Sequence, residues 1–384
     1  MDKSSKKTFI FLCGLVFILS FSVQATAALI PTLAAYFRES PIVAGKLVWF
    51  YMLPYGLCAL VWAPLSRKIS VKKILIFCLT VFSFSSLLVA SSTSLAFAFL
   101  GRLSMGVFGS SLVPLSLITI GKEYGGKEKP KYVGIFFSVG FSSGLAGVFL
   151  SGILPWRLIY GIPALLSFLA AVSGFLLIKD LDYRGKFKIS YLSTFKDRGV
   201  LKLFSFIFVL SFLYHSTQQW LGVYLSEKYQ FSQFFISSAL TVSALAAIFS
   251  ESIGGFLSSR FGSDTIASLG LISMVIFIFI SFFLNTPAGI FFLIVFWGGG
   301  WAFNHVGLSS FLAGLPDKFL RDASSLNSSL RFVSGGLGTY FGGKSIAGLG
   351  FFRHLFIVGI ALFLISFLIK KHLKIRTQEA GGVY

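Results

Sequence analysis

The chain has 384 residues, of which 55% are hydrophobic and only 12% are charged, and its mean hydropathy is +0.86. With 47 Phe and only 13 acidic residues, too few charges remain to cover a water-facing globule of this size, which excludes soluble enzymes and secreted disulfide scaffolds. The three cysteines, Cys13, Cys58 and Cys78, lie inside apolar stretches without a nearby His or Cys at metal-ligand spacing. We therefore expect an integral membrane protein with neither disulfides nor a metal site.

The apolar runs predict an all-α membrane protein with twelve transmembrane helices. A helix needs about 20 largely apolar residues to cross a bilayer, and open-edged sheets are excluded there because unpaired backbone groups find no water. The predicted helices span residues 9–33, 44–65, 74–90, 94–120, 132–154, 157–178, 203–225, 233–257, 265–284, 288–312, 323–346 and 352–369. A polar, basic linker at 179–202 divides the chain into an N-terminal bundle, 1–178, and a C-terminal bundle with a short tail, 203–384.

Most of the 33 Lys and Arg residues lie between the apolar runs. If the N-terminus is cytoplasmic, 25 of these 33 fall in cytoplasmic segments, including seven between Lys179 and Lys202. This positive-inside asymmetry explains the net charge of +20 without nucleic acid as a partner. It predicts a multi-pass protein of the inner (cytoplasmic) membrane with both termini in the cytoplasm.

The N-terminus also has features of a secretory signal: a basic start, an apolar run from Phe9 to Phe21, and small residues at Ala25-Thr26-Ala27. We expect the first helix to be retained, because its removal would leave eleven spans and reverse the fit between basic loops and cytoplasm. Removal would also break an internal repeat.

That repeat has a period of half the chain length. The segment APLSRKISVKKIL begins at Ala63, and GFLSSRFGSDTIA begins 192 residues later at Gly255. At offsets of 192 or 191 the matching pairs are Leu65 and Leu257, Ser66 and Ser258, Lys68 and Arg260, Gly106 and Gly298, Gly144 and Gly335, Gly147 and Gly338, and Gly152 and Gly343. Two pseudo-symmetric six-helix bundles are predicted.

Taken in order, these motifs resemble the major facilitator superfamily over residues 9–372. Many members carry Gly-x-Leu-Ser-Asp-Arg-x-Gly-x-Arg-Arg between their second and third helices, where this chain keeps Leu65, Ser66, Lys68, Lys72 and Lys73. Further matches are Leu257, Ser258, Arg260, Phe261 and Gly262 in the second repeat, Arg102 with Gly106 in the fourth helix, Trp156-Arg157 opening the sixth, and SSLNSSLRFVSGGLGTYFGG in the eleventh. The resemblance implies a monomeric secondary transporter, most like the drug and sugar efflux branch.

The loop that carries this motif departs from the family at one position. The family's Asp, which pairs with the N-terminal end of the eleventh helix, is Arg67 in the first repeat and Ser259 in the second. We expect Arg67 or Lys68 to approach Asp317 or Asp322 instead, as a latch of opposite polarity. The gating-loop candidates are therefore Arg67, Lys68, Lys72, Arg260, Asp317 and Asp322.

The fifth helix departs as well. Antiporters of the family carry Gly-Pro-x-x-Gly-Gly, where this chain has Gly147-Val148-Phe149-Leu150-Ser151-Gly152, so the antiporter pattern is only partly kept. The candidate gating glycines are Gly144, Gly147, Gly152, Gly335, Gly338 and Gly343. Small residues of this kind let helices approach and slide, or simply pack.

Three charged residues stand out inside the apolar spans. Glu251 is the only acidic one, and an ionised carboxylate there costs about 3 kcal/mol unless it is paired or faces water. Glu251 is therefore either a proton carrier or a structural ion-pair partner near the cytoplasmic end. The resemblance implies that Arg102 influences proton transfer or braces the fourth helix. Arg331 either binds an anionic substrate group or has a structural role.

In the family, helices one, four, seven and ten line the substrate cavity. The polar and aromatic candidates, together with Arg331, are Gln24, Tyr214, His215, Gln218, Gln219, Trp220, Trp301, Asn304 and His305. His215 and Gln219 are four residues apart and share a helix face. Amides and imidazoles of this kind either orient a ligand or join helices, and the Trp rings either stack on a planar ligand or fill space.

The leading hypothesis is proton-linked efflux of a small organic solute, with the solute, protons and the lipid bilayer as partners. One alternative is an importer or facilitator of an organic anion, suggested by the excess of Arg over acid within the membrane. Another is a membrane sensor or scaffold without flux. The sequence contains no nucleophile–base pair, metal cluster or Gly-x-x-x-x-Gly-Lys-Ser/Thr segment. Neither an enzyme nor ATP-driven transport is therefore predicted, and no cofactor.

Overall fold

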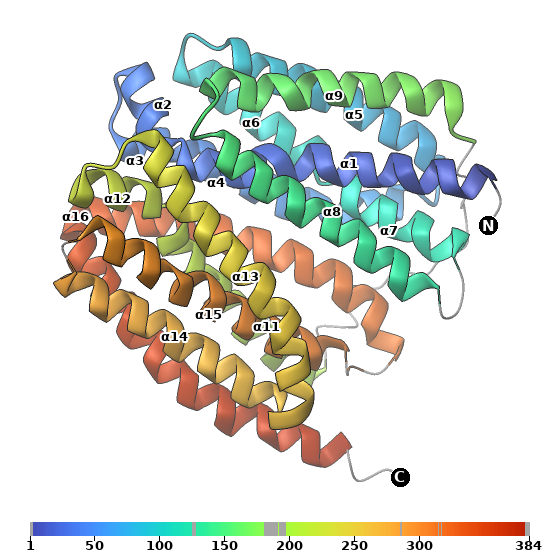
Figure 1. Cartoon of the computed structure of the whole chain (residues 1–384). Coiled ribbons are helices and arrows are strands. Elements are labelled where there is room, and N and C mark those ends of the chain that lie inside the picture. Colours follow the sequence, from blue (N-terminus) through green and yellow to red (C-terminus); the bar gives the residue numbers. More distant parts are fainter. Residues whose placement is uncertain are drawn as a thin grey trace. The chain divides into compact units, whose positions relative to one another are not determined.

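The computed structural model describes residues 3–124, 128–179, 191, 197–284, 286–313, 315 and 317–380, and nearly all of them are helical (Figure 1). No β-strand occurs in this part of the chain. The chain divides into two compact units, Met1–Ile189 and Ser190–Tyr384. The all-α fold that the sequence predicts is confirmed.

In the first unit, α1 packs against α8 and α9, α5 against α6 and α9, and α4 against α6. The helices of this unit are α1 (Lys3–Ala28), α2 (Ile30–Phe37), α3 (Pro41–Ala44), α4 (Lys46–Leu65), α5 (Val71–Ser91), α6 (Leu95–Gly109), α7 (Leu112–Glu123), α8 (Lys129–Leu150) and α9 (Trp156–Leu177).

In the second unit, α15 packs against both α13 and α14, and α16 packs against α11 and α14. The helices of this unit are α11 (Arg198–Gln218), α12 (Leu221–Tyr229), α13 (Gln233–Phe261), α14 (Ser263–Phe283), α15 (Pro287–Ala313) and α16 (Asp317–Ala380).

Eleven helical stretches among the described residues are long and apolar enough to cross a membrane. The last of them, Leu326–His372, contains Gly350 in a non-helical conformation with φ 78° and ψ 164°, which favours glycine. Gly350 divides this stretch into 326–349 and 351–372, and each part suffices to cross a bilayer at about 1.5 Å per residue. With that division there are twelve membrane-length segments, as predicted.

Three predicted helices, 9–33, 94–120 and 203–225, are each divided into two in the structure, and the second of them shows how. The structure ends α6 at Gly109 and begins α7 at Leu112. Between them, the hydroxyls of Ser110 and Ser111 donate to the carbonyls of Val107 and Phe108, and such local bonds compete with the regular helical ladder. Hydropathy does not register this competition, so the sequence predicts one helix where the structure has two.

The outer surface of both units is apolar. Phe175, Leu176, Phe283 and Phe292 are each more than two-thirds exposed, and many other large apolar side chains are exposed with them. Contiguous apolar surface on this scale is unusual in contact with water, whereas lipid chains solvate it.

The internal repeat is visible in close contacts between helices, which occur first in the first unit. A Cβ atom built on Gly106 of α6 would overlap the carbonyl oxygen of Tyr51 in α4, and one built on Gly147 of α8 would overlap that of Phe21 in α1. Only glycine permits these backbones to approach so closely.

The second unit repeats both contacts at the predicted offsets. Gly298 of α15 lies against the Ser243 carbonyl of α13, each 192 residues after its counterpart. Gly338 of α16 lies against the Phe212 carbonyl of α11, each 191 residues after its counterpart. The pseudo-symmetry therefore extends to individual backbone contacts.

Candidate functional site

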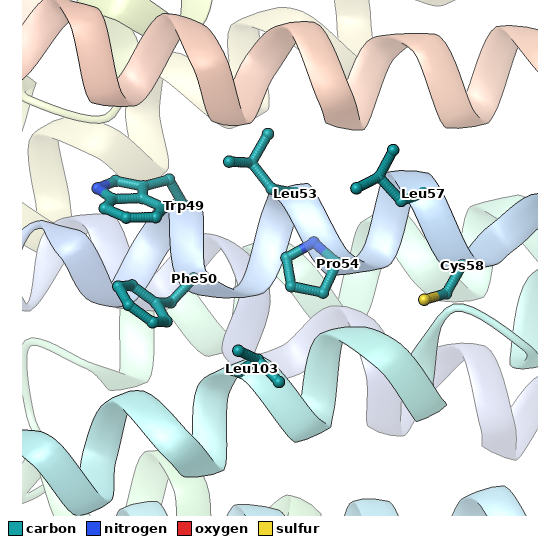
Figure 2. Close-up of a pocket in the computed structure, with 7 residues that line it drawn as sticks. All are labelled: Trp49, Phe50, Leu53, Pro54, Leu57, Cys58 and Leu103. Carbon is teal, nitrogen blue, oxygen red and sulfur yellow. The ribbon is translucent and has the colours of Figure 1, made fainter.

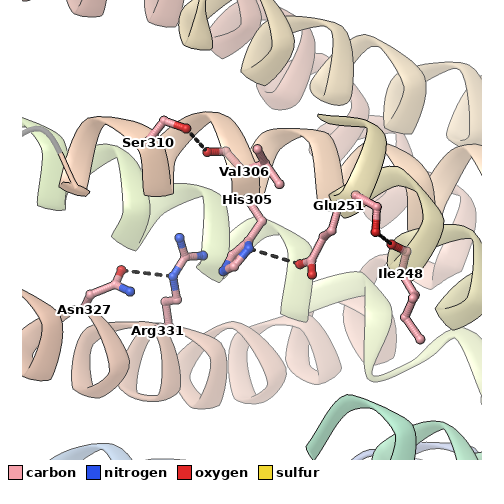
Figure 3. Close-up of polar contacts among 8 residues, drawn as sticks. Ile248, Glu251, His305, Val306, Ser310, Asn327 and Arg331 are labelled. Carbon is pink, nitrogen blue, oxygen red and sulfur yellow. Dashed lines mark hydrogen bonds and ion pairs between the residues drawn. The ribbon is translucent and has the colours of Figure 1, made fainter. Parts of the chain in front are cut away.

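Three charged or titratable side chains from three helices converge in the second unit (Figure 3). Glu251 of α13 lies with its Oε1 3.2 Å from Nδ1 of His305 in α15. His305 lies between Glu251 and Arg331 of α16, and it interacts electrostatically with both. The side chains of His305 and Glu251 are 31% and 30% exposed, so both retain access to the medium.

The side chain of Arg331 is hydrogen-bonded to a residue of its own helix. Its Nε donates to Oδ1 of Asn327, one turn earlier, at 3.0 Å. Its two terminal nitrogens are buried and have no hydrogen-bond partner. The guanidinium carbon lies 5.9 Å from the ring centre of Trp301. Two pairs of N–H donors are therefore held next to an aromatic ring without an acceptor.

An aromatic stack adjoins this cluster. The ring of Tyr214 in α11 stacks on Trp301 at 3.8 Å between centroids and 7° between planes, and on Trp297 at 5.4 Å and 17°. Nε1 of Trp297 donates to Oε1 of Gln218 at 2.6 Å, which ties α15 to α11. The Tyr214 ring thus stacks on two Trp rings of α15.

His215 completes the cluster beside Tyr214. Its Nδ1 lies 2.8 Å from the carbonyl oxygen of Ser211, which can only accept, so Nδ1 carries the proton. The other ring nitrogen, Nε2, is then an acceptor. The cluster therefore combines fixed donors on Arg331, an acceptor on His215 and a carboxyl–imidazole pair. We call Glu251, His305, Arg331, Tyr214, His215 and Trp301 the polar cluster.

The remaining cavity candidates lie outside the polar cluster. Trp220 is 2% exposed, donates to the Thr339 carbonyl at 3.1 Å and packs its ring against Gly343. Asn304 is fully buried, and its Nδ2 lies 3.4 Å from the carbonyl of Ala267 in α14. Gln24 lies against Gly144, between α1 and α8. Gln219 is the C-terminal cap residue of α11.

Arg102 lies in the first unit, apart from the polar cluster. It is fully buried in α6, and its Nε donates to the Leu47 carbonyl of α4 at 3.0 Å. Its guanidinium carbon lies 4.4 Å from the ring centre of Tyr51 and 5.8 Å from that of Tyr160. This hydrogen bond joins α6 to α4.

The gating-loop candidates are described only in part. Arg67 and Lys68 are exposed in the turn after α4. Lys72 donates from Nζ to the carbonyls of Phe175 and Ile178, at 3.1 and 2.5 Å, and so caps the C-terminal end of α9. Arg260 lies next to the ring of Phe261. The side chains of Asp317 and Asp322 lie outside the described residues, and with them the predicted latch.

Among the candidate glycines, Gly147 and Gly338 make the backbone contacts given above, while Gly152 follows α8 and Gly335 is a buried residue of α16. The sequence did not single out Trp297 or Asn327. Trp297 lies four residues before Trp301, and Asn327 lies four residues before Arg331. This helical spacing is a signal in the sequence that could have identified both residues.

A shallow apolar groove of about 320 Å³ lies along α4 and α6 (Figure 2). Its lining residues are Trp49, Phe50, Leu53, Pro54, Leu57, Cys58 and Leu103. The groove surface is apolar throughout, so it offers no group that would orient a polar solute.

Comparison with known proteins gives consistent matches along the chain. Residues 10–339 match the family model described as Major Facilitator Superfamily. Two proteins of Bacillus subtilis (strain 168) are each 22% identical to the chain. Multidrug resistance protein 2 matches over 298 residues, 72% of this chain and 73% of its own length. The uncharacterized MFS-type transporter YbcL matches over 264 residues, 66% of this chain and 67% of its own length.

Among solved structures, a bacterial homolog of the human lysosomal transporter Spinster, in an inward-facing and unoccupied conformation, superposes with a TM-score of 0.79. The match covers 97% of this chain and 98% of that one, at 13% sequence identity. At this identity the similarity concerns the fold alone.

Proposed function

The chain belongs to the Major Facilitator Superfamily, and we propose that it is a secondary transporter that exports a small organic solute in exchange for protons. The observation that carries this proposal is the polar cluster, in which Glu251, His305 and Arg331 converge from three helices within one unit. Transport of this kind needs a polar site within the membrane that the rocking of helix bundles exposes to either side in turn.

The carboxyl–imidazole pair supplies the proton step. At 3.2 Å, Glu251 and His305 can exchange a proton without a large movement of heavy atoms, and both side chains are partly exposed. With His305 neutral and Glu251 ionised, the charges of Glu251 and Arg331 balance. Uptake of one proton by the pair leaves a net positive charge, which weakens the binding of a cationic solute. Solute and proton then compete for the site, which is what antiport requires.

The aromatic stack supplies the solute contact. The ring of Trp301 lies beside Arg331 and His305, and the ring of Tyr214 stacks on it with 3.8 Å between the ring centroids. A rigid aromatic surface next to polar groups accepts planar organic solutes, because the ring buries apolar area and the polar groups set orientation. The resemblance to Multidrug resistance protein 2 supports export of such a compound.

Reconstitution into proteoliposomes tests this proposal. A panel of planar organic compounds is screened for movement driven by an imposed pH gradient, with internal pH followed by a trapped dye. We expect Glu251→Gln to abolish gradient-driven accumulation and to retain solute exchange, because only the protonation cycle is lost. The matched control is Glu227→Gln, an exposed carboxyl at the end of α12, which should behave as wild type.

Gradient-driven transport that persists unchanged in Glu251→Gln would remove Glu251 from the mechanism. Loss of folding in that variant would support a structural ion pair with His305 instead. A wild-type protein that moves no compound under any gradient would favour the sensor or scaffold hypothesis.

The unpartnered nitrogens of Arg331 favour a second candidate, import or facilitated movement of an organic anion. A carboxylate would accept from both terminal nitrogens in the bidentate geometry that guanidinium groups favour. Arg331→Lys keeps the charge and loses that geometry, so it should raise the apparent KM for an anionic solute and leave a cationic one unaffected. Counterflow with anionic and cationic solutes of similar size distinguishes the two candidates.

A further inference from the structure

We propose that Arg102 and Tyr51 form a buried binding site for a small anion, either a halide or the carboxylate group of a small acid. The site lies wholly within the first unit, so this proposal does not depend on the role proposed for the polar cluster. Its ligand is defined by three features: a buried positive charge, a set of unused hydrogen-bond donors, and the absence of an ion pair between Arg102 and any described carboxylate of that unit.

The positive charge is deeply buried. Arg102 has 0% of its surface exposed, and of its donors only Nε is used, on the carbonyl of Leu47. Both terminal nitrogens are buried and without a partner. A guanidinium stays protonated in proteins, so it needs acceptors and a counter-charge. The rings of Tyr51 and Tyr160 face it, but they offer it π-electrons and no full negative charge.

The described residues of the first unit supply no counter-charge. Glu39, Glu123 and Glu128 lie at helix ends or in a loop, and none of them forms an ion pair with Arg102. Glu123 accepts a hydrogen bond from Ser5. The Arg102 charge is therefore left to an ion from outside.

The hydroxyl groups near the Arg102 guanidinium differ in the donors that they have left. The hydroxyl of Tyr51 is buried without a partner, and so is that of Ser22 in α1. Thr26, one turn after Ser22, donates to the Ser22 carbonyl at 2.8 Å, so the hydroxyl of Tyr160 must donate to Thr26 across their 2.9 Å contact. Tyr160 therefore has no donor left for Arg102 or for a ligand, while Tyr51 and Arg102 have donors and no acceptor. Water could accept these bonds, but only an anion also offsets the charge.

A close backbone contact between α4 and α6 positions Tyr51 opposite Arg102. Gly106 lies one turn after Arg102 and brings α6 against the carbonyl of Tyr51, so that the Tyr51 ring and the guanidinium face each other. The equivalent contact of the second unit, Gly298 against Ser243, has Ser243 in place of Tyr51 and Ile294 in place of Arg102. The fold repeats the contact, whereas the chemistry of the site is particular to the first unit.

The test uses the full chain purified in detergent. Its thermal unfolding temperature is measured by intrinsic Trp fluorescence while chloride, bromide, formate or acetate replaces the bulky anion isethionate at constant ionic strength. We expect a saturable rise in the unfolding temperature for at least one small anion, because a ligand that binds only the folded state stabilises it. Halide alone indicates an inorganic ion. Carboxylates alone indicate the acidic group of an organic solute.

Arg102→Gln should lower the rise substantially, and any remainder then belongs to the guanidinium of Arg331 in the polar cluster. The matched control is Arg157→Gln, since the guanidinium of Arg157 is already hydrogen-bonded to the carbonyls of Ala90 and Ser92 and to the hydroxyl of Tyr36. This control should keep the anion response. Tyr51→Phe removes one donor and should raise the half-saturating anion concentration about tenfold, which is the usual value of a hydrogen bond to a charged group.

Tyr51→Phe also decides the question if Arg102→Gln does not fold, because loss of a single hydroxyl leaves the packing in place. A wild-type unfolding temperature that is the same in every anion would overturn the proposal. So would an anion response that persists unchanged in Arg102→Gln, or in Tyr51→Phe.

Discussion

Replacing Gly147 by Ala should destabilise the first unit by about 2 kcal/mol, because an added methyl group would overlap the carbonyl oxygen of Phe21 in α1. The obstacle is backbone of another helix, so no rotamer change relieves it, and α1 and α8 have to separate. One turn earlier, Ser143 donates to the Phe17 carbonyl at 2.5 Å, and a displacement would strain that bond too. Overpacking of this kind costs about 3 kcal/mol, and the better helix propensity of Ala offsets up to about 1.

Gly134→Ala is the matched control, since Gly134 lies in the same helix and an added Cβ would meet nothing within 4 Å. Propensity then acts alone and should stabilise the protein by up to about 1 kcal/mol. Reversible unfolding of both variants, measured by denaturant titration in mixed micelles, gives the difference of about 3 kcal/mol directly. Two variants that unfold alike would refute the packing argument. A loss of flux at wild-type stability in Gly147→Ala would instead indicate a moving, gating contact.

Two further predictions concern the connections between helices. Lys72→Ala should lower stability by about 1 kcal/mol, because the carbonyls of Phe175 and Ile178 lose their cap, whereas Lys73→Ala, at an exposed neighbouring position, should have little effect. Thermal unfolding of the two variants decides this, and equal effects would contradict it. In a variant without native cysteines, single cysteines at positions 190 and 380 should react with a membrane-impermeant reagent only after the cells are opened. Labelling of position 190 in intact cells would overturn the proposed topology.

The helices could be predicted from hydropathy because the bilayer imposes a similar length on every span. The predicted helix 265–284 differs from α14, Ser263–Phe283, by two residues at its start and one at its end. The interruption between α6 and α7 could not be predicted in this way. It depends on the hydroxyl groups of Ser110 and Ser111, which donate to nearby backbone carbonyls. The mean hydropathy of a window does not detect such bonds.

The members of the polar cluster could be predicted individually but not as a group. Glu251 and Arg331 stand out because charge is rare within apolar spans. That Glu251 meets His305, with Arg331 on its other side, depends on how α13, α15 and α16 cross. Crossing is set by close contacts such as Gly298 against Ser243, and the sequence shows the glycine without its partner.

The two units share backbone contacts and differ in charge. Gly106 and Gly298, like Gly147 and Gly338, fix equivalent helix pairs at the same repeat offset, so the repeat preserves what helix packing within a membrane requires. The charged side chains beside these contacts are not repeated: Arg102 of the first unit corresponds to Ile294 of the second. Under our two proposals, the copies of one architecture therefore bind different ligands: a small anion at Arg102, which forms no ion pair among the described residues of the first unit, and a proton at Glu251 and His305 in the second unit.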